Sequence, residues 1–159
     1  MADENAMLKA RQTYQNMVAM FEKKNWNFRR DDEKMVVSCS ASGDDLPLDV
    51  RMSVDAERKL VMMLSKMPYT VPEEKRVDVA LAVAYVNNRL INGGFDYDIR
   101  NGMIFFRMVS SFDGCELGNE AFRYMLTCSC TTTDDYNDKF FMIATGTLSI
   151  DKFMEEKSN

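Results

Sequence analysis

The feature that most constrains this fold is an alternation of apolar and polar residues, with a period of two, along residues 26–67. A strand with one buried face and one hydrated face has this period. The alternation is clearest in residues 35–41 and 48–54, and we expect residues 26–29 to add a short edge strand. The pattern therefore predicts an antiparallel meander with one wet face. Its hairpin turns are expected in the polar interruptions at residues 31–34, 43–47 and 56–58.

Two later segments are apolar on both sides. Residues 60–64 contain only leucine, valine and methionine, and residues 103–109 are largely apolar at both odd and even positions. A strand of this kind has to be covered on each of its faces. Residues 103–109 are also predicted to form a hairpin with residues 95–99. The connection runs through Asn101-Gly102, a dipeptide typical of a type I′ turn.

Three segments have the spacing of three and four between apolar residues that an amphipathic helix requires. They lie at residues 1–24, about 72–91 and about 118–145. Thr70 is predicted as the N-cap of the second helix, and Gly93-Gly94 as its end. The apolar side of that helix is expected to consist of Val77, Ala80, Leu81, Ala84 and Ile91.

The resulting order of elements is α-β-β-β-β-α-β-β-α. Helices at these places cannot be crossovers between parallel strands, so we expect an α+β fold, an antiparallel sheet with helices packed on one face. One apolar set of the two-faced strands is then left to meet another protein chain or an additional segment. Periodicity does not decide which set faces outward. The candidate partner-binding residues are Val61, Met63, Met103, Phe105, Phe106 and Met108.

The composition removes most enzyme chemistry. The chain has no histidine, which excludes an imidazole general base, a Ser-His or Cys-His nucleophile pair and a His-ligated zinc. Four irregularly spaced cysteines form no CxxC pair and are expected to be free thiols. Residues 134–145 lack the glycine and the glutamate of a calcium loop. Asp96 and Asp98 could pair as acid and base, but a solvent-facing hairpin explains them better. We therefore expect no catalytic residues, no metal and no cofactor.

Charge and hydropathy exclude further classes of partner. Twenty Lys and Arg against twenty-five Asp and Glu give a net charge of −5, so the field of the molecule repels phosphate backbones and anionic lipid. No run of 18 apolar residues occurs, and the amino terminus is acidic rather than a signal sequence. We expect a cytoplasmic protein that binds neither nucleic acid nor membrane. Its 14 methionines suit protein binding because their flexible side chains repack easily, although filling an irregular core is the alternative for each.

Four stretches of the chain carry a family resemblance: residues 67–76, 85–90, 94–98 and 102–107. They contain a Pro-Glu-Glu helix start, a mid-helix asparagine and a Phe-x-x-Asp hairpin, and together they resemble the YbjN family of bacterial sensory transduction regulators. The resemblance implies a fold similar to that of class I type III secretion chaperones, usually dimeric and without known catalytic residues. Arg76 and Asn87 match positions at which the family tends to carry the same residues.

We predict a single domain over residues 1–159. It divides into an N-terminal helix at 1–24, a YbjN-like core at 26–147 and a short C-terminal tail at 148–159.

The leading hypothesis for function is a non-enzymatic protein-binding or regulatory module. It would act in bacterial regulation or signalling through an apolar sheet face, as a homodimer or by holding a protein client. The alternatives are a sensor that binds a small ligand between sheet and helix near Arg76, Asn87 and Arg107, and an acidic immunity protein. An enzyme that uses carboxylates alone is the third class.

Overall fold

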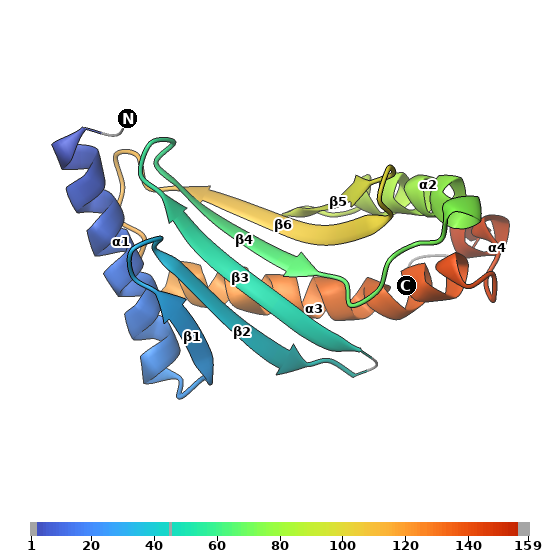
Figure 1. The fold of residues 1–159 in the computed structure, drawn as a ribbon, viewed down its shortest axis with the longest axis horizontal. Coiled ribbons are helices and arrows are strands. Elements are labelled where there is room, and N and C mark those ends of the chain that lie inside the picture. The colour runs from blue at the N-terminus through green and yellow to red at the C-terminus, as the bar shows by residue number, and fades with distance from the viewer. Residues whose placement is uncertain (1–2, 45, 156–159) are drawn as a thin grey trace.

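The computed structural model describes residues 3–44 and 46–155, and in that part of the chain the elements follow the predicted order. Figure 1 shows a curved sheet with one long helix running behind it. The strands are β1 (Phe28–Asp31), β2 (Val36–Ser42), β3 (Pro47–Asp55), β4 (Leu60–Lys66), β5 (Gly94–Asp98) and β6 (Met103–Ser111). The α-helices are α1 (Glu4–Lys23), α2 (Arg76–Asn87), α3 (Asn119–Ala144) and α4 (Ile150–Glu155), and a 3-10 turn, η1 (Glu73–Lys75), precedes α2.

The six strands form one antiparallel sheet in the order β1-β2-β3-β4-β6-β5. The first four strands are the predicted meander, and the later hairpin joins it through β6, so that β5 becomes an edge strand. The inner face of the sheet is built partly from methionine. One transverse row brings Val37, Met52, Met63 and Met108 into register on β2, β3, β4 and β6, and all four side chains are buried.

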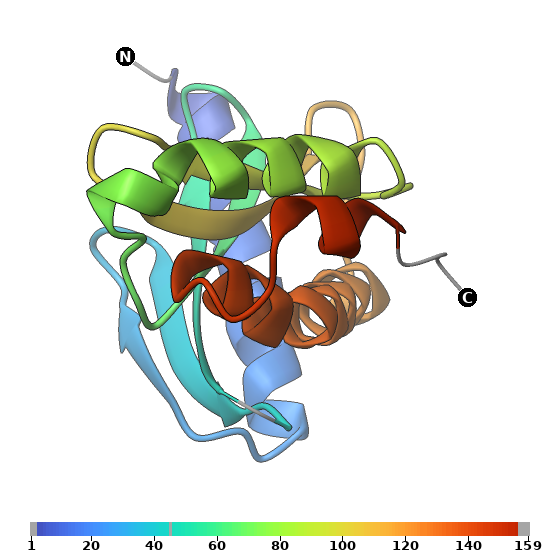
Figure 2. The same cartoon turned by 90° about the vertical axis from the view of Figure 1, so that its right-hand side faces the viewer.

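Helices cover one face of this sheet, as predicted. Helix α3 contacts β3, β4 and β6 along the inner face, and α1 contacts β3 and α3 near the β1 end (Figure 1). At the opposite end, α2 contacts β5, α3 and α4, and Figure 2 shows these three helices from that end. The apolar side chains between α1, α3 and the sheet form the core. Within residues 3–44 and 46–155, no helix packs on the opposite face of the sheet (Figure 1).

The second helix differs from its prediction in both its ends and its buried side. It begins at Arg76 after η1, without a side-chain cap, so Thr70 is not its N-cap. It ends at Asn87, well before Gly93. Its buried residues are Val79, Ala82, Val83 and Val86, whereas the predicted apolar side is turned largely outward. Valine and alanine occur all around this helix, so its periodicity alone could not identify the buried side.

The β5–β6 turn also departs from the prediction of a type I′ turn. Register pairs Asp98 with Met103, which leaves a four-residue connection. Only Gly102 in that connection has a positive φ, at 73°, whereas a type I′ turn needs positive φ at both central residues. Asp98 organises the loop, because its carbonyl accepts from the Gly102 amide at 2.7 Å and its carboxylate accepts from the Arg100 amide at 3.0 Å.

Helices α3 and α4 form the C-terminal part of the described chain. Helix α3 is continuous through Thr131, Thr132 and Thr133, although β-branched residues have a low helix propensity. Ser149 directly precedes α4, and its hydroxyl accepts from the Lys152 amide in the first turn of that helix at 3.3 Å. The buried ring of Phe153 fixes this last helix against Phe140 of α3 and Tyr85 of α2. Of the segment predicted as a short tail at 148–159, residues Ile150–Glu155 therefore form a packed helix, and residues 156–159 lie outside the described part of the chain.

Candidate protein-binding surface

The pleat of β4 and β6 decides which of the predicted partner-binding residues can meet another protein. Val61 and Met63 on β4, and Phe106 and Met108 on β6, are at most 3% exposed. Strands β4 and β6 both pack on α3, and these four side chains lie in the core on that side. A partner cannot reach them in this structure, so the prediction is corrected for these four. Their large apolar side chains serve the core instead.

The other two predicted residues, Met103 and Phe105, lie on the face that no helix covers. Both are half-buried. The pairing of β4 with β6 adds Met62, which lies opposite Val109, and Leu64, which lies opposite Arg107. Sequence reasoning missed Met62 and Leu64, although each is one position from a residue it named. Only the burial of Val61 and Met63 shows that the even positions of β4 face outward.

This open face is hollowed where β1 to β4 and β6 curve together. The hollow has a volume of about 720 Å³ and runs from Arg29 on β1 to Phe105 on β6. Its floor is apolar toward β6, where Leu64 and Phe105 lie, and polar toward β1. The residues that line it are Asn27, Phe28, Arg29, Ser38, Cys39, Ser40, Asp49, Val50, Arg51, Leu64, Lys66 and Phe105.

Charges in and beside the hollow are arranged unevenly. Asp49, the acidic lining residue, accepts a hydrogen bond from the Ser40 hydroxyl at 2.7 Å. Beside the hollow, Arg107 binds Asp96 through Nε at 2.5 Å and Nη2 at 3.0 Å, and this contact raises the pKa of Arg107. Three cationic residues line the hollow: Arg29, Arg51 and Lys66. None of them forms an ion pair with another described residue.

The structure does not bring the predicted small-ligand residues into one site. The Arg76 Nη1 donates to the Arg100 carbonyl at 2.8 Å and so braces the β5–β6 turn. Asn87 binds the backbone of Phe95, and Arg107 is occupied by Asp96. All three side chains contact the β5–β6 hairpin, but each has a separate partner there and none of them lines the hollow.

Both carboxylates considered for acid-base chemistry accept hydrogen bonds from arginines, Asp96 from Arg107 and Asp98 from Arg100. Hydrogen bonds from Arg100 lower the pKa of Asp98, whereas a general acid near neutral pH needs a raised one.

In residues 3–44 and 46–155 no three His, Cys, Asp or Glu side chains are grouped in a way that could hold a metal ion. Among the described helices, none is both long and apolar enough to span a bilayer.

A family model decides the relationship of this chain to known proteins. The YbjN model, described as "Putative bacterial sensory transduction regulator", matches residues 13–142. The chain belongs to the YbjN family. The match begins within α1, earlier than residue 26, where the resemblance of the sequence was placed. Among curated proteins, no relative matches.

Solved structures share the fold of this YbjN-family chain at low sequence identity. The ExsC-ExsE complex matches with a TM-score of 0.59 and 14% identity, over 80% of this chain and 92% of the other. The HopA1-SchA chaperone-effector complex matches with a TM-score of 0.55 and 11% identity, over 80% and 95%. YbjN from E. coli matches with a TM-score of 0.53 and 9% identity, over 84% and 89%. The fold is therefore α+β and like that of type III secretion chaperones, as the resemblance implied.

Proposed function

We propose that this protein is a non-enzymatic binding module of the bacterial cytoplasm that holds a segment of a partner protein on the open face of its sheet, in regulation or signalling. The observation that carries the proposal is the hollow itself. Leu64 and Phe105 form an apolar floor on a face that no helix covers, next to Met62 and Met103. Apolar side chains gathered on an uncovered face are typical of a protein-interaction site.

Two of the structural relatives support a protein partner rather than a small ligand. The ExsC-ExsE structure is a complex of two proteins, and the HopA1-SchA structure is a chaperone bound to its effector. Identities of 14% and 11% speak for the fold alone, so partner binding is proposed for this chain from its own surface.

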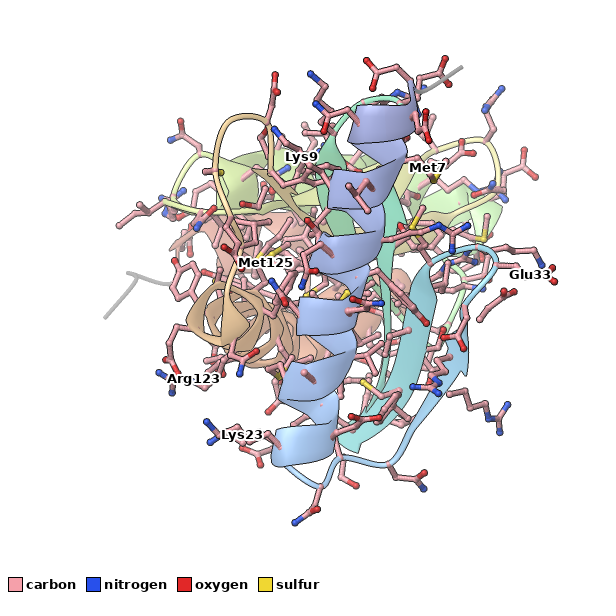
Figure 3. All side chains as sticks on the ribbon, turned by 90° about the vertical axis from the view of Figure 1, so that its left-hand side faces the viewer. Met7, Lys9, Lys23, Glu33, Arg123 and Met125 are labelled. Carbon is pink, nitrogen blue, oxygen red and sulfur yellow. The ribbon has the colours of Figure 1, made fainter. Side chains whose placement is uncertain are left out.

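A photo-crosslinking amino acid at Leu64 tests the proposal in the native host. The matched control carries the same group at Lys9, an exposed residue of α1. Lys9 is a suitable control because it lies on the side of α1 away from the β1–β2 turn, where Figure 3 shows Glu33. We expect protein adducts from position 64 that are absent from position 9. Adducts at neither position, or equal adducts at both, would contradict a partner site on the open face.

We also propose that two copies associate through α2. The side chains of Val77 and Leu81 lie on the outer side of this helix and are 64% and 50% exposed. A twofold interface is self-complementary, so one apolar helix face can pair with its own copy. Light scattering should give twice the mass of the chain, and Leu81→Glu should give a monomer. A monomeric wild type at the highest concentration tested would contradict this interface.

A further inference from the structure

The hollow is cationic in a protein whose net charge is negative. Arg29, Arg51 and Lys66 line it, while Asp49 is the acidic lining residue, in a chain with a net charge of −5. Most other arginines have a carboxylate or a carbonyl within hydrogen-bond distance, as Arg107 has Asp96 and Arg76 has Arg100. These three cations form no ion pair with any described residue and line one hollow that is apolar at its β6 end, a charge arrangement that an anionic partner would complete.

The strand register fixes how these groups lie relative to one another. Arg29, Arg51 and Leu64 belong to one transverse row, because Arg29 and Arg51 both pair with Ser38 and Arg51 pairs with Leu64. The next row brings Lys66 beside Phe105. Neighbouring strands are about 4.8 Å apart, so β1 and β6, four strand spacings apart, are separated by about 19 Å. An extended chain rises about 3.3 Å per residue, so about six residues cross the hollow.

We propose that this hollow binds an extended acidic segment of a partner protein. Its carboxylates lie over Arg29, Arg51 and Lys66, and an apolar side chain that follows them packs on Leu64 and Phe105. This assignment rests on the proposed function and adds the chemistry of the segment to it. Carboxylates match the cations, and the aliphatic surface of Leu64 matches an apolar side chain.

A peptide fits this surface better than a single-stranded nucleic acid does. Nucleic-acid sites on open sheets combine a positive field with several aromatic rings on which bases stack. Here the two lining aromatic residues lie at opposite ends of the hollow: Phe28 packs on Phe21 of the core, and Phe105 on β6 lies opposite Asp96 of β5.

Fluorescence anisotropy with labelled peptides tests the charge preference. One probe carries aspartates at alternate positions followed by leucine and phenylalanine, and a second probe has lysines in place of the aspartates. We expect only the acidic probe to bind, and its affinity to fall as salt is raised. Arg51→Glu and Lys66→Glu should each weaken binding by about fivefold or more. Lys9→Glu makes the same charge change on α1 and should leave binding unchanged.

The outcomes separate this inference from the proposed function. Equal binding of the two peptides would overturn the proposal that the hollow binds an acidic segment. Unchanged binding of the acidic peptide by both Arg51→Glu and Lys66→Glu would overturn it too. If position 64 still crosslinks to a partner protein in that case, the proposed function stands without this chemistry. Tighter binding of a labelled single-stranded oligonucleotide, weakened by Lys66→Glu and not by Lys9→Glu, would overturn both.

Discussion

Asn87 of α2 binds both backbone groups of Phe95 on β5. Its Nδ2 donates to the Phe95 carbonyl at 2.9 Å, and its Oδ1 accepts from the Phe95 amide at 2.8 Å. Strand β5 is at the edge of the sheet, so these two groups point away from β6 and have no strand to pair with. One side-chain amide thus replaces a neighbouring strand at this position and fixes α2 to the sheet. Such protection keeps an edge from pairing with another chain.

Replacing Asn87 by alanine should lower the free energy of unfolding by about 1 to 2 kcal/mol, since both hydrogen bonds are lost. Urea denaturation followed by circular dichroism measures the change. Asn88→Ala is the matched control, because Asn88 is an exposed neighbour on the same helix end. Equal effects of the two substitutions would show that the contact with Phe95 contributes nothing beyond helix propensity.

The resemblance to the YbjN family singled out Asn87 without giving it a role, and the reason is physical. Its partner is backbone, and no pattern of side chains records which backbone groups lack a strand. The outward face of β4 was undetermined for a related reason. Valine, methionine and leucine occupy both faces there, so the choice depends on the register with β6, far along the chain. By contrast, the alternation in β2 and β3 distinguished their inner and outer faces from sequence alone.

Gly102 is expected to be the glycine least tolerant of substitution in the β5–β6 hairpin. Its φ is 73°, its carbonyl accepts from the Val71 amide at 2.9 Å, and an added Cβ would overlap the Val71 backbone. Gly114 has a φ of 75° and no atom within 4 Å of such a Cβ, which makes it the control for backbone strain alone. Gly114→Ala should cost about 1 to 2 kcal/mol.

Gly102→Ala should cost about 3 kcal/mol or more, because overlap with the Val71 backbone adds to the strain. Thermal unfolding of both variants measures the difference. If the two substitutions shift the midpoint equally, the contact between Gly102 and Val71 is not tight in solution.

The cysteines should differ in reactivity because they differ in burial. Burial raises the pKa of Cys39 to about 12, whereas Cys115 is exposed. Since the thiolate is the nucleophile, a maleimide at neutral pH should label Cys115 rapidly and Cys39 only after unfolding. Mass spectrometry of the labelled peptides identifies the sites. Rapid labelling of Cys39 in the folded protein would show that the reagent reaches the buried side of β2 without global unfolding.

The same burial gives a pH dependence of stability with a definite sign. The folded-state pKa of Cys39 lies above its usual value of 9.0, so the unfolded chain loses the thiol proton first as pH rises. The contribution of Cys39 is therefore complete below pH 9 and is lost as the pH rises toward 12. Cys39→Val should flatten the fall in unfolding free energy over this range. Cys115→Val is the matched control and should leave it unchanged.

A polar seam lies buried along α3, and removing one of its hydroxyls should stabilise the protein. Ser129, Thr133 and Asn137 follow one another at helical spacing, are fully buried, and each has a side-chain oxygen without a hydrogen-bond partner among the described residues. An unpaired buried hydroxyl costs about 1 to 3 kcal/mol, so the isosteric Thr133→Val should raise the free energy of unfolding by about 1 kcal/mol or more.

Thr131→Val provides the control for this last prediction, because Thr131 is exposed on the same helix and the change in helix propensity is the same. Its effect should stay within about 0.5 kcal/mol. Guanidinium denaturation of the two variants gives the comparison. A loss of stability in Thr133→Val alone would mean that the hydroxyl is bound to an internal water molecule, in which case the seam stabilises the packing of α3 on the sheet.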